Sequence, residues 1–438
     1  MISRSWCVRS LPRFFPFVLI AVTLFPLKSY ALNLRHHGRK RAPRPLVVGY
    51  FPQWGFYLDE PYYVKNLITN GGIELLDQIN YAEGFVSGGR CSVADPRADL
   101  NAAYTRENSV SGAADDAVSP FRGYFHQLKE LKARYPGLKI LISLEGKAAD
   151  FSEDAKPENR RAFVASCVDT FLRGHFAPGI SESGIFDGFD IDWESPRESD
   201  AENFQALLKE FRRQMNAVRP GLRLSIAVGH TPHMLPGTDF AAVAKLVDQV
   251  GIMNYDYTGP WDPTTGFLAP LFSSPADPGY PNSIEQSIAD YKGAGVPAEK
   301  LLMGLPFYGY SWTAVSQANN GLFQRGRSIR GDKPYRYIRT LAAFVPNYRD
   351  PRSHAPCLFD GETFWTFEDP TSVRYKASYA AHQRLGGIMI WELSDDTASA
   401  ELLTMAYFSL HLPLKSAVFA EAAGIPRQRP TLRFALGD

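Results

Sequence analysis

Residues 187–194 read Asp-Gly-Phe-Asp-Ile-Asp-Trp-Glu, so four carboxylates fall within eight positions. The last three alternate with large apolar residues, and this period is typical of a β-strand rather than of a solvated run of charges. Side chains two residues apart on a strand point to one face at a spacing of about 6.6 Å. We therefore expect Asp190, Asp192 and Glu194 to line one wall of a site.

The closeness of these carboxyls has a chemical consequence. Like charges at this spacing cannot all ionise freely, so at least one carboxyl should have a raised pKa, which suits a general acid that works near neutral pH. A calcium loop is the structural alternative for such an acidic run, but those loops carry a turn glycine and polar residues between their ligands. The apolar residues within 187–194 instead favour an acid-base site.

Seven further short apolar segments are candidate strands, and longer helical patterns lie between them. Eight such repeats are typical of parallel βα units and predict an α/β fold, a closed (β/α)8 TIM barrel. Catalytic side chains of this fold lie at the C-terminal ends of the strands, which would bring Glu194 to the mouth. The expected strands are 46–51, 78–82, 139–144, 186–193, 223–228, 249–255, 301–306 and 387–391.

Changes in pattern divide the chain around this barrel. A basic segment at 32–45 is predicted to be a linker, the barrel is predicted to cover 46–412, and a tail follows at 413–438. Residues 310–363, between the seventh and eighth strands, are too many for a simple βα connection, so we expect a small insertion subdomain there. The polar stretch 95–120 is predicted to be a long loop on the active face.

The first 31 residues have the features of a secretory signal peptide. Three arginines precede an apolar run at 14–26, and Ser29-Tyr30-Ala31 fits a small-x-small cleavage site. The run of about 13 residues is shorter than the roughly 20 that a membrane anchor needs. We expect cleavage near Ala31, a chain secreted to the periplasm or outside the cell, and no stable membrane insertion.

Composition and motifs exclude several function classes. With 47 basic and 46 acidic residues among 438, the near-zero net charge gives no indication of nucleic-acid binding. His230 and His233 lack the helical spacing and the glutamate of a zinc protease site, and neither a phosphate-binding glycine loop nor a Gly-x-Ser-x-Gly motif occurs. We therefore expect no cofactor and no metal.

The cysteines allow at most one internal bridge. Cys7 leaves with the signal peptide, and an odd number remains, namely Cys91, Cys167 and Cys357. Cys167 lies on an apolar helical face, which is typical of a core residue. If a bridge forms, we expect it to join Cys91 and Cys357.

The carboxylate strand is similar to the active-site signature of glycoside hydrolase family 18, the chitinases and their relatives, in the form Asp187-x-x-Asp190-x-Asp192-x-Glu194. Segments of the first, sixth, seventh and eighth expected strands also resemble this family in order and spacing, and the resemblance covers about residues 46–412. These segments are Val48–Phe51 with Trp54, Met253–Asp256, Gly304–Gly309 and Gly386–Glu392. A series of strand-end motifs is far more specific than one acidic signature.

The resemblance implies a retaining, substrate-assisted glycoside hydrolase. Glu194 would protonate the glycosidic oxygen, while the 2-acetamido carbonyl of the substrate attacks the anomeric carbon to give an oxazolinium ion that water then opens. Asp192 would hold the acetamido N–H and stabilise the developing positive charge. Asp190 would share a proton with Asp192, and Asp187 would support the strand.

Further roles follow from the same resemblance. Tyr255 would be catalytic by donating to the acetamido oxygen, Asp256 would touch the sugar at the cleavage subsite, and Trp391 would form an apolar floor under a sugar ring. Structural alternatives remain open, since Tyr50 and Trp391 could be ordinary barrel core and Asp256 a strand cap. The expected substrate-binding residues are Tyr50, Asp187, Met253, Asp256, Trp391 and Trp261.

Two positions depart from the family pattern. The family usually has Tyr-Ala-Phe on the second strand and Ser-x-Gly-Gly-Trp on the third, where this chain has Tyr81-Ala82-Glu83 and Ser143-Leu144-Glu145-Gly146-Lys147. Both changes add a carboxylate, which we expect to lie close to Asp187 and Asp190.

The extra acids permit two interpretations. In the first, Glu145 pairs with Lys147, and Glu83 faces solvent or an arginine. In the second, both acids raise the pKa of Glu194 or reshape the sugar subsites, which would change the pH optimum or the substrate preference.

The resemblance leaves the substrate open. The first interpretation is a secreted, monomeric chitinase whose partners are chitin or N-acetylglucosamine oligosaccharides. An endo-β-N-acetylglucosaminidase or a peptidoglycan-directed enzyme is the second. A third, a non-catalytic chitin-binding protein of the lectin type, is disfavoured because Glu194, Asp192 and Tyr255 are all present.

Overall fold

The computed structural model describes residues 44–415 except 117, 278, 280 and 281. The expected signal peptide, nearly all of the expected linker and most of the expected tail lie outside the described residues. Within the described part of the chain, no helix is both long and apolar enough to cross a membrane.

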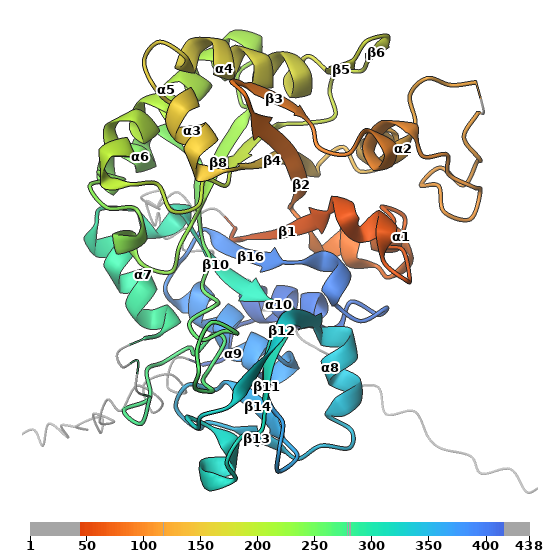
Figure 1. The fold of residues 1–438 in the computed structure, drawn as a ribbon. Coiled ribbons are helices and arrows are strands. Elements are labelled where there is room, and N and C mark those ends of the chain that lie inside the picture. Colours follow the sequence, from red (N-terminus) through yellow and green to blue (C-terminus); the bar gives the residue numbers. More distant parts are fainter. Residues whose placement is uncertain (1–43, 117, 278, 280–281, 416–438) are drawn as a thin grey trace, which may run out of the picture. The chain divides into compact units, whose positions relative to one another are not determined.

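Eight parallel strands form a barrel at the centre of the fold (Figure 1). In the order in which they pair, they are β1 (Leu46–Pro52), β2 (Gln78–Ser87), β4 (Lys139–Gly146), β7 (Gly188–Ile191), β8 (Arg223–Val228), β9 (Gln249–Ile252), β10 (Leu301–Pro306) and β16 (Gly387–Trp391). The barrel closes because β16 pairs with β1. Each strand overlaps one of the predicted segments, although β7 and β9 end at Ile191 and Ile252, before the predicted ends at 193 and 255. The predicted (β/α)8 barrel is confirmed.

Helices lie outside the strands because each presents an apolar face to them. In α5 this face includes Phe204, Leu207, Phe211 and Met215, which are all buried, and the Phe211 ring lies 5.2 Å from that of Phe189 on β7. The helices are α1 (Asn66–Thr69), α2 (Gly123–Arg134), α3 (Ala148–Asp154), α4 (Arg160–Cys167), α5 (Ala201–Val218), α6 (Phe240–Leu246), α7 (Ile284–Gly293), α8 (Tyr335–Leu341), α9 (Pro370–His382) and α10 (Glu401–His411).

A second sheet lies between β10 and β16 in the sequence. Its five strands are antiparallel and pair in the order β12 (Arg327–Pro334), β11 (Tyr308–Thr313), β15 (Phe364–Thr366), β14 (Pro356–Phe359) and β13 (Asn347–Arg349). The sheet runs from 308 to 366 in the sequence, slightly beyond the 310–363 expected for an insertion. A separate small hairpin is formed by β5 (His175–Ala177) and β6 (Ile180–Ser181).

The second barrel strand is longer than predicted. It continues to Ser87 and turns back as β3 (Arg90–Val93), which pairs with it in antiparallel fashion. The turn is made by Gly88 and Gly89, both with positive φ, a conformation that glycine adopts without steric cost. This hairpin occupies part of the interval between the predicted strand, 78–82, and the predicted loop, 95–120.

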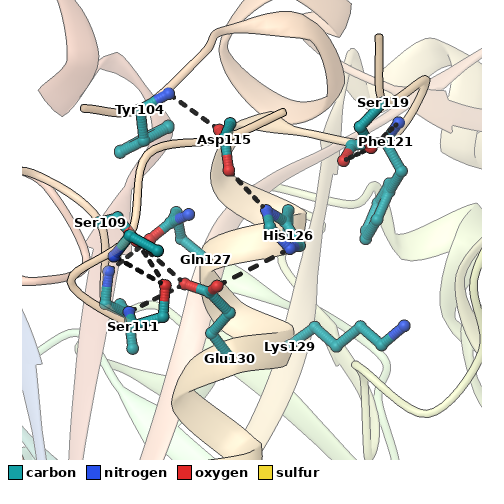
Figure 2. A network of polar contacts seen from close by, with 12 residues as sticks. Tyr104, Ser109, Ser111, Asp115, Ser119, Phe121, His126, Gln127, Lys129 and Glu130 are labelled. Carbon is teal, nitrogen blue, oxygen red and sulfur yellow. Dashed lines mark hydrogen bonds and ion pairs between the residues drawn. The ribbon is translucent and has the colours of Figure 1, made fainter. Parts of the chain in front are cut away.

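The predicted long loop at 95–120 contains one short helical turn, and much of the rest is fixed on α2 by polar contacts (Figure 2). The His126 ring lies between two carboxylates, with Nδ1 at 3.0 Å from Asp115 and Nε2 at 3.8 Å from Glu130. The backbone N–H of Ser111 also donates to Glu130 at 3.1 Å. These contacts give an irregular segment a defined position.

The predicted pairing of the cysteines is wrong. A disulfide joins Cys91 to Cys167, whose Cα atoms are 4.7 Å apart, and Cys357 is a buried free thiol on β14. The reason is the hairpin that the sequence analysis missed. Because β2 folds back as β3, Cys91 lies against the C-terminal end of α4, whereas Cys357 belongs to the other sheet.

Candidate active site

Two cavities of about 340 and 430 Å³ meet at the C-terminal ends of the barrel strands. Both are lined by Glu194, Ala227, Met253, Tyr255 and Asp256. The first cavity also includes the apolar side chains of Val228, Met234, Leu235 and Trp261. The second includes Tyr50, Trp54, Glu145, Asp192, Asp332 and Trp391. Glu194 therefore stands between a mainly apolar cavity and one rich in aromatic and acidic groups.

Asp190 lies inside the barrel, midway along the run of acids, and is 1% exposed. Tyr50 donates to its Oδ2 at 2.6 Å and Ser143 at 3.0 Å, while Ser225 donates to Oδ1. Burial raises the pKa of Asp190, although hydrogen bonds from these hydroxyls and from Asn80 oppose the rise. Both oxygens of this carboxyl already have protein partners.

Asp192 follows the last residue of β7 and lies above Asp190. Its Oδ1 atom is buried and has no hydrogen-bond partner among the described residues. Burial raises the pKa of Asp192 well above its usual range, and the negative charges of Glu194, Asp190, Glu145 and Glu83 add to this rise. The neutral form of Asp192 is therefore favoured, and one of its oxygens is free for a ligand.

Glu194 lies two residues further on, at the junction of the cavities. Its side chain reaches the open cavity, yet the surrounding protein removes part of its hydration, and this burial raises its pKa. The charges of Glu145 and Asp256 raise the pKa further. A carboxyl that is both accessible and protonated toward neutral pH can act as a general acid.

Tyr255 and Asp256 follow β9, which ends at Ile252 and is separated from β7 by one strand, β8. Tyr255 is 7% exposed and lines both cavities. Asp256 adopts a left-handed conformation with φ of 62°, and its Oδ1 accepts a hydrogen bond from Tyr308 at 2.6 Å. Burial raises the pKa of Asp256, while the hydrogen bonds from Tyr308 and Tyr310 oppose this rise.

Aromatic rings form the remaining walls. The Trp391 ring, at the end of β16, lies 5.3 Å from the Tyr50 ring and 5.8 Å from the Trp54 ring. Trp261 is 61% exposed and its ring lies 5.8 Å from that of Tyr310. The expected residues Tyr50, Trp391 and Trp261 thus all line the cavities.

Asp187 lies elsewhere, and the expectation that it binds substrate is wrong. It precedes β7 at the opposite end of the barrel, where Lys132 and Arg219 approach its carboxylate at 2.9 and 3.1 Å. Its Oδ2 also accepts from the backbone N–H of Ile140 at 3.0 Å. Burial alone would raise the pKa of Asp187, but Lys132 and the other donors hold it below its usual value. Asp187 is a structural residue.

Glu145 shares a cavity with Asp192 and Glu194, and the charge of Glu83 acts on Asp192, so the expected closeness of these two acids to Asp187 is also wrong. Glu145 lines the second cavity, and no ion pair joins it to Lys147 within the part of the chain that the structure describes. Burial, followed by the hydrogen bond and the charge of Glu145, raises the pKa of Glu83 to about 8.

Sequence reasoning missed the side chains that support the acids. Ser143 and Ser225 are the register partners of Asp190 on the neighbouring strands β4 and β8, and Tyr308 holds Asp256. The signal for the two serines was present, because a polar residue within an otherwise apolar barrel strand must find a partner inside the barrel. Tyr308 carried no such signal.

Residues 46–396 match the sequence profile of glycosyl hydrolases family 18. The chain belongs to this family. Chitinase C of Streptomyces lividans is 34% identical over 369 residues, which cover 81% of this chain and 58% of that relative. Chitinase 63 of Streptomyces plicatus is 33% identical, with 84% of this chain and 61% of the relative covered. This family 18 chain therefore spans less than two thirds of the length of these relatives.

Solved structures of family 18 proteins have the same fold. The catalytic domain of psychrophilic chitinase B from Arthrobacter TAD20 superposes with a TM-score of 0.76 at 30% identity, covering 87% of this chain and 97% of that one. A mutant of Group II chitinase catalytic domain 2 from Ostrinia furnacalis, in complex with the oligosaccharide (NAG)5, gives a TM-score of 0.68 at 25% identity, covering 84% and 97%. Family membership agrees with the acidic site at the strand ends.

Proposed function

We propose that this family 18 protein hydrolyses β-1,4-linked N-acetylglucosamine polymers, that is chitin or chitooligosaccharides. The observation that carries the proposal is the position of Glu194, a carboxyl with a raised pKa at the junction of two cavities. The names of the similar proteins, chitinases from Streptomyces and Arthrobacter, support the choice of substrate.

In the proposed mechanism the substrate supplies its own nucleophile. Glu194 protonates the glycosidic oxygen while the 2-acetamido carbonyl attacks the anomeric carbon, which gives an oxazolinium ion and releases the leaving sugar. Water deprotonated by Glu194 then opens this ion from the opposite face. Two inversions at the anomeric carbon give net retention, and no protein nucleophile is needed.

The neighbouring acids control the acetamido group in this proposal. The unpartnered Oδ1 of Asp192 accepts the acetamido N–H, which turns the carbonyl oxygen toward the anomeric carbon. Loss of the Asp192 proton to its carboxyl neighbours leaves a negative charge beside the oxazolinium ion. Asp190, held by its hydroxyl donors, fixes the geometry of the carboxyl cluster below Asp192.

The other walls bind the sugar in the same scheme. Tyr255 donates to the acetamido oxygen, and Asp256 accepts from a sugar hydroxyl. Trp391 packs against the C–H face of the sugar ring whose own acetamido group attacks the anomeric carbon. Met253 and the exposed Trp261 contact the sugar on the leaving-group side, within the mainly apolar first cavity.

Replacement of the acid tests this function. We expect Glu194→Gln to lower kcat on chitooligosaccharides about 10²- to 10⁴-fold, because the amide cannot transfer a proton. Glu299→Gln is the matched control. It makes the same change of charge at a residue that lies beside Leu46 and Gly386, at the other end of the barrel.

Other substrates define the limits of the proposal. Wild type and Glu194→Gln should be compared on chitin, on a glycoprotein with N-glycans and on bacterial cell wall. Release of sugar from glycoprotein or cell wall without cleavage of chitooligosaccharides would replace the chitinase proposal by the N-acetylglucosaminidase or peptidoglycan alternative. No turnover of any of them would contradict a hydrolase function.

We also propose that the chain is exported. The proposal rests on the arginines, the apolar run and the small-x-small site at the start of the sequence. Sequencing of the N-terminus of protein recovered from outside the cytoplasm checks it, and an intact Met1 there would contradict cleavage near Ala31.

A further inference from the structure

Glu83 occupies a bulge in the barrel wall. Ala82 pairs with Ser143 of β4 and Gly84 with the next residue, Leu144, so Glu83 has no register partner. A bulge redirects a side chain away from the regular alternation of a strand. On β4, Glu145 stands opposite Phe85, two residues beyond the bulge, and lines the second cavity.

The two carboxyls behave as one group. A hydrogen bond between Glu83 and Glu145 requires that one of them hold a proton, so the pair carries a single negative charge while that proton stays bound. Burial is the main reason that the pKa of Glu83 rises to about 8, and the bond and charge of Glu145 contribute. Behind Glu83, the buried Asp99 accepts from Tyr81 and Gln53 and adds negative charge.

The described residues place no cation in the second cavity beside this pair. Among the described residues, no Lys, Arg or His side chain lines the second cavity, and Lys147 is exposed at the start of the helix that follows β4. Asp190 raises the pKa of Asp192, Asp256 raises that of Glu194, and Asp332 also lines the second cavity. In the first cavity Glu194 faces His230, whose pKa is lowered by burial, so its neutral form is favoured. Among the described residues, no Lys or Arg in either cavity opposes the charge of the pair.

We propose that Glu83 and Glu145 form one positioning unit whose single shared negative charge keeps the Glu194 carboxyl protonated toward neutral pH and so extends hydrolysis to higher pH. The inference rests on the proposed role of Glu194 as the acid. Neither residue of the pair needs to touch the reacting atoms, because the effect is electrostatic.

The test compares the two single variants with the double variant. Glu83→Gln leaves Glu145 able to carry the charge, so the alkaline limb of the pH profile of kcat/KM should move little. Glu145→Gln leaves only Glu83, whose pKa burial still raises, so the limb should move part of the way that it moves in the double variant. The double variant removes the charge, and we expect its alkaline limb to move about one pH unit toward acid. Glu299→Gln, at the other end of the barrel, should leave the limb in place.

A merely structural role gives a different result. It would lower the rate at every pH and leave the limb where it is, which would overturn the inference. The inference also fails if Glu145→Gln alone moves the limb as far as the double variant does, since the charge would then not be shared.

A measurement without substrate separates this inference from the proposed function. Titration of the Glu194 carboxyl by ¹³C NMR should give a lower pKa in the double variant than in the wild type. Equal values overturn the inference whether or not the protein hydrolyses any sugar. A lowered value in a protein that hydrolyses none of the substrates would support the coupling and contradict the function proposed for Glu194.

Discussion

The two ends of β7 carry the same kind of side chain in opposite electrostatic settings. At the start, Asp187 lies between Lys132 and Arg219, which hold its pKa down. Beyond the end, Asp192 and Glu194 are surrounded by other acids, and their pKa values are raised. A carboxylate neutralised by cations stabilises the barrel, whereas a carboxyl that keeps its proton is available for chemistry. Barrel folds commonly divide stability and catalysis between their two ends in this way.

The largest effect is expected at the end that carries the proposed chemistry. Asp192→Asn should lower kcat on chitooligosaccharides about 10²- to 10³-fold, because the amide cannot become the negative charge that stabilises the oxazolinium ion. Thermal stability at neutral pH should not fall, since the variant no longer has to keep a buried carboxyl protonated. Steady-state kinetics and a melting curve check both statements. A loss of kcat below fivefold would contradict the role of Asp192.

The opposite result is expected at the other end of the strand. Asp187→Asn should leave kcat nearly unchanged and lower the free energy of unfolding by about 1 to 3 kcal/mol, because two cations and a backbone N–H lose a charged partner. Urea unfolding of the two proteins measures this difference. A large loss of kcat in the folded variant would show that the two ends are not separate.

The pH dependence of that stability difference has a defined sign. The folded pKa of Asp187 lies below its ordinary value, so its contribution is fully present above the unfolded pKa of about 3.9 and is lost as pH falls through the folded pKa. The difference between wild type and Asp187→Asn should therefore be constant near pH 7 and disappear in strong acid. A difference that grows on acidification would contradict the ion-pair explanation.

The smallest effect is expected midway between the ends. Tyr50→Phe removes one donor from Asp190 while two serines remain. We expect kcat to fall about three- to tenfold, the contribution of one ordinary hydrogen bond, and the melting temperature to change little because the ring still packs against Trp391. Ser143→Ala is the matched comparison, since it removes a donor from the same oxygen, Oδ2. Unchanged kcat in both variants would show that the support of Asp190 is redundant.

The barrel was predictable because its strands are short apolar runs separated by helical patterns, and a parallel sheet buried on both faces requires such runs. The position of Glu194 followed from the fold, since strand ends converge at the mouth. The parity of the strand could also have excluded Asp187, because it differs by an odd number of positions from Asp190 and Asp192 and so belongs to the other face.

Other features depended on contacts that no single segment encodes. The disulfide partner of Cys91 depends on where the β2–β3 hairpin lies, although Gly88-Gly89 is itself a hairpin signal that was overlooked. The bulge that turns Glu83 toward Glu145 arises from the pairing of β2 with β4. Burial is the largest cause of the raised pKa of Asp192, and the charges of four acids add to it, two of which, Glu145 and Glu83, lie on β4 and β2, so the pKa could not be derived from one strand alone.

The bridge between Cys91 and Cys167 also bears on how this protein can be produced. The two cysteines are 76 positions apart, and the loop that they close contains β4, so the strand that carries Glu145 lies inside a covalent ring. Disulfides form and persist in oxidising compartments. Recombinant chain made in a reducing cytoplasm would lack this ring, and its pH profile should be compared only with that of material whose thiols have been counted.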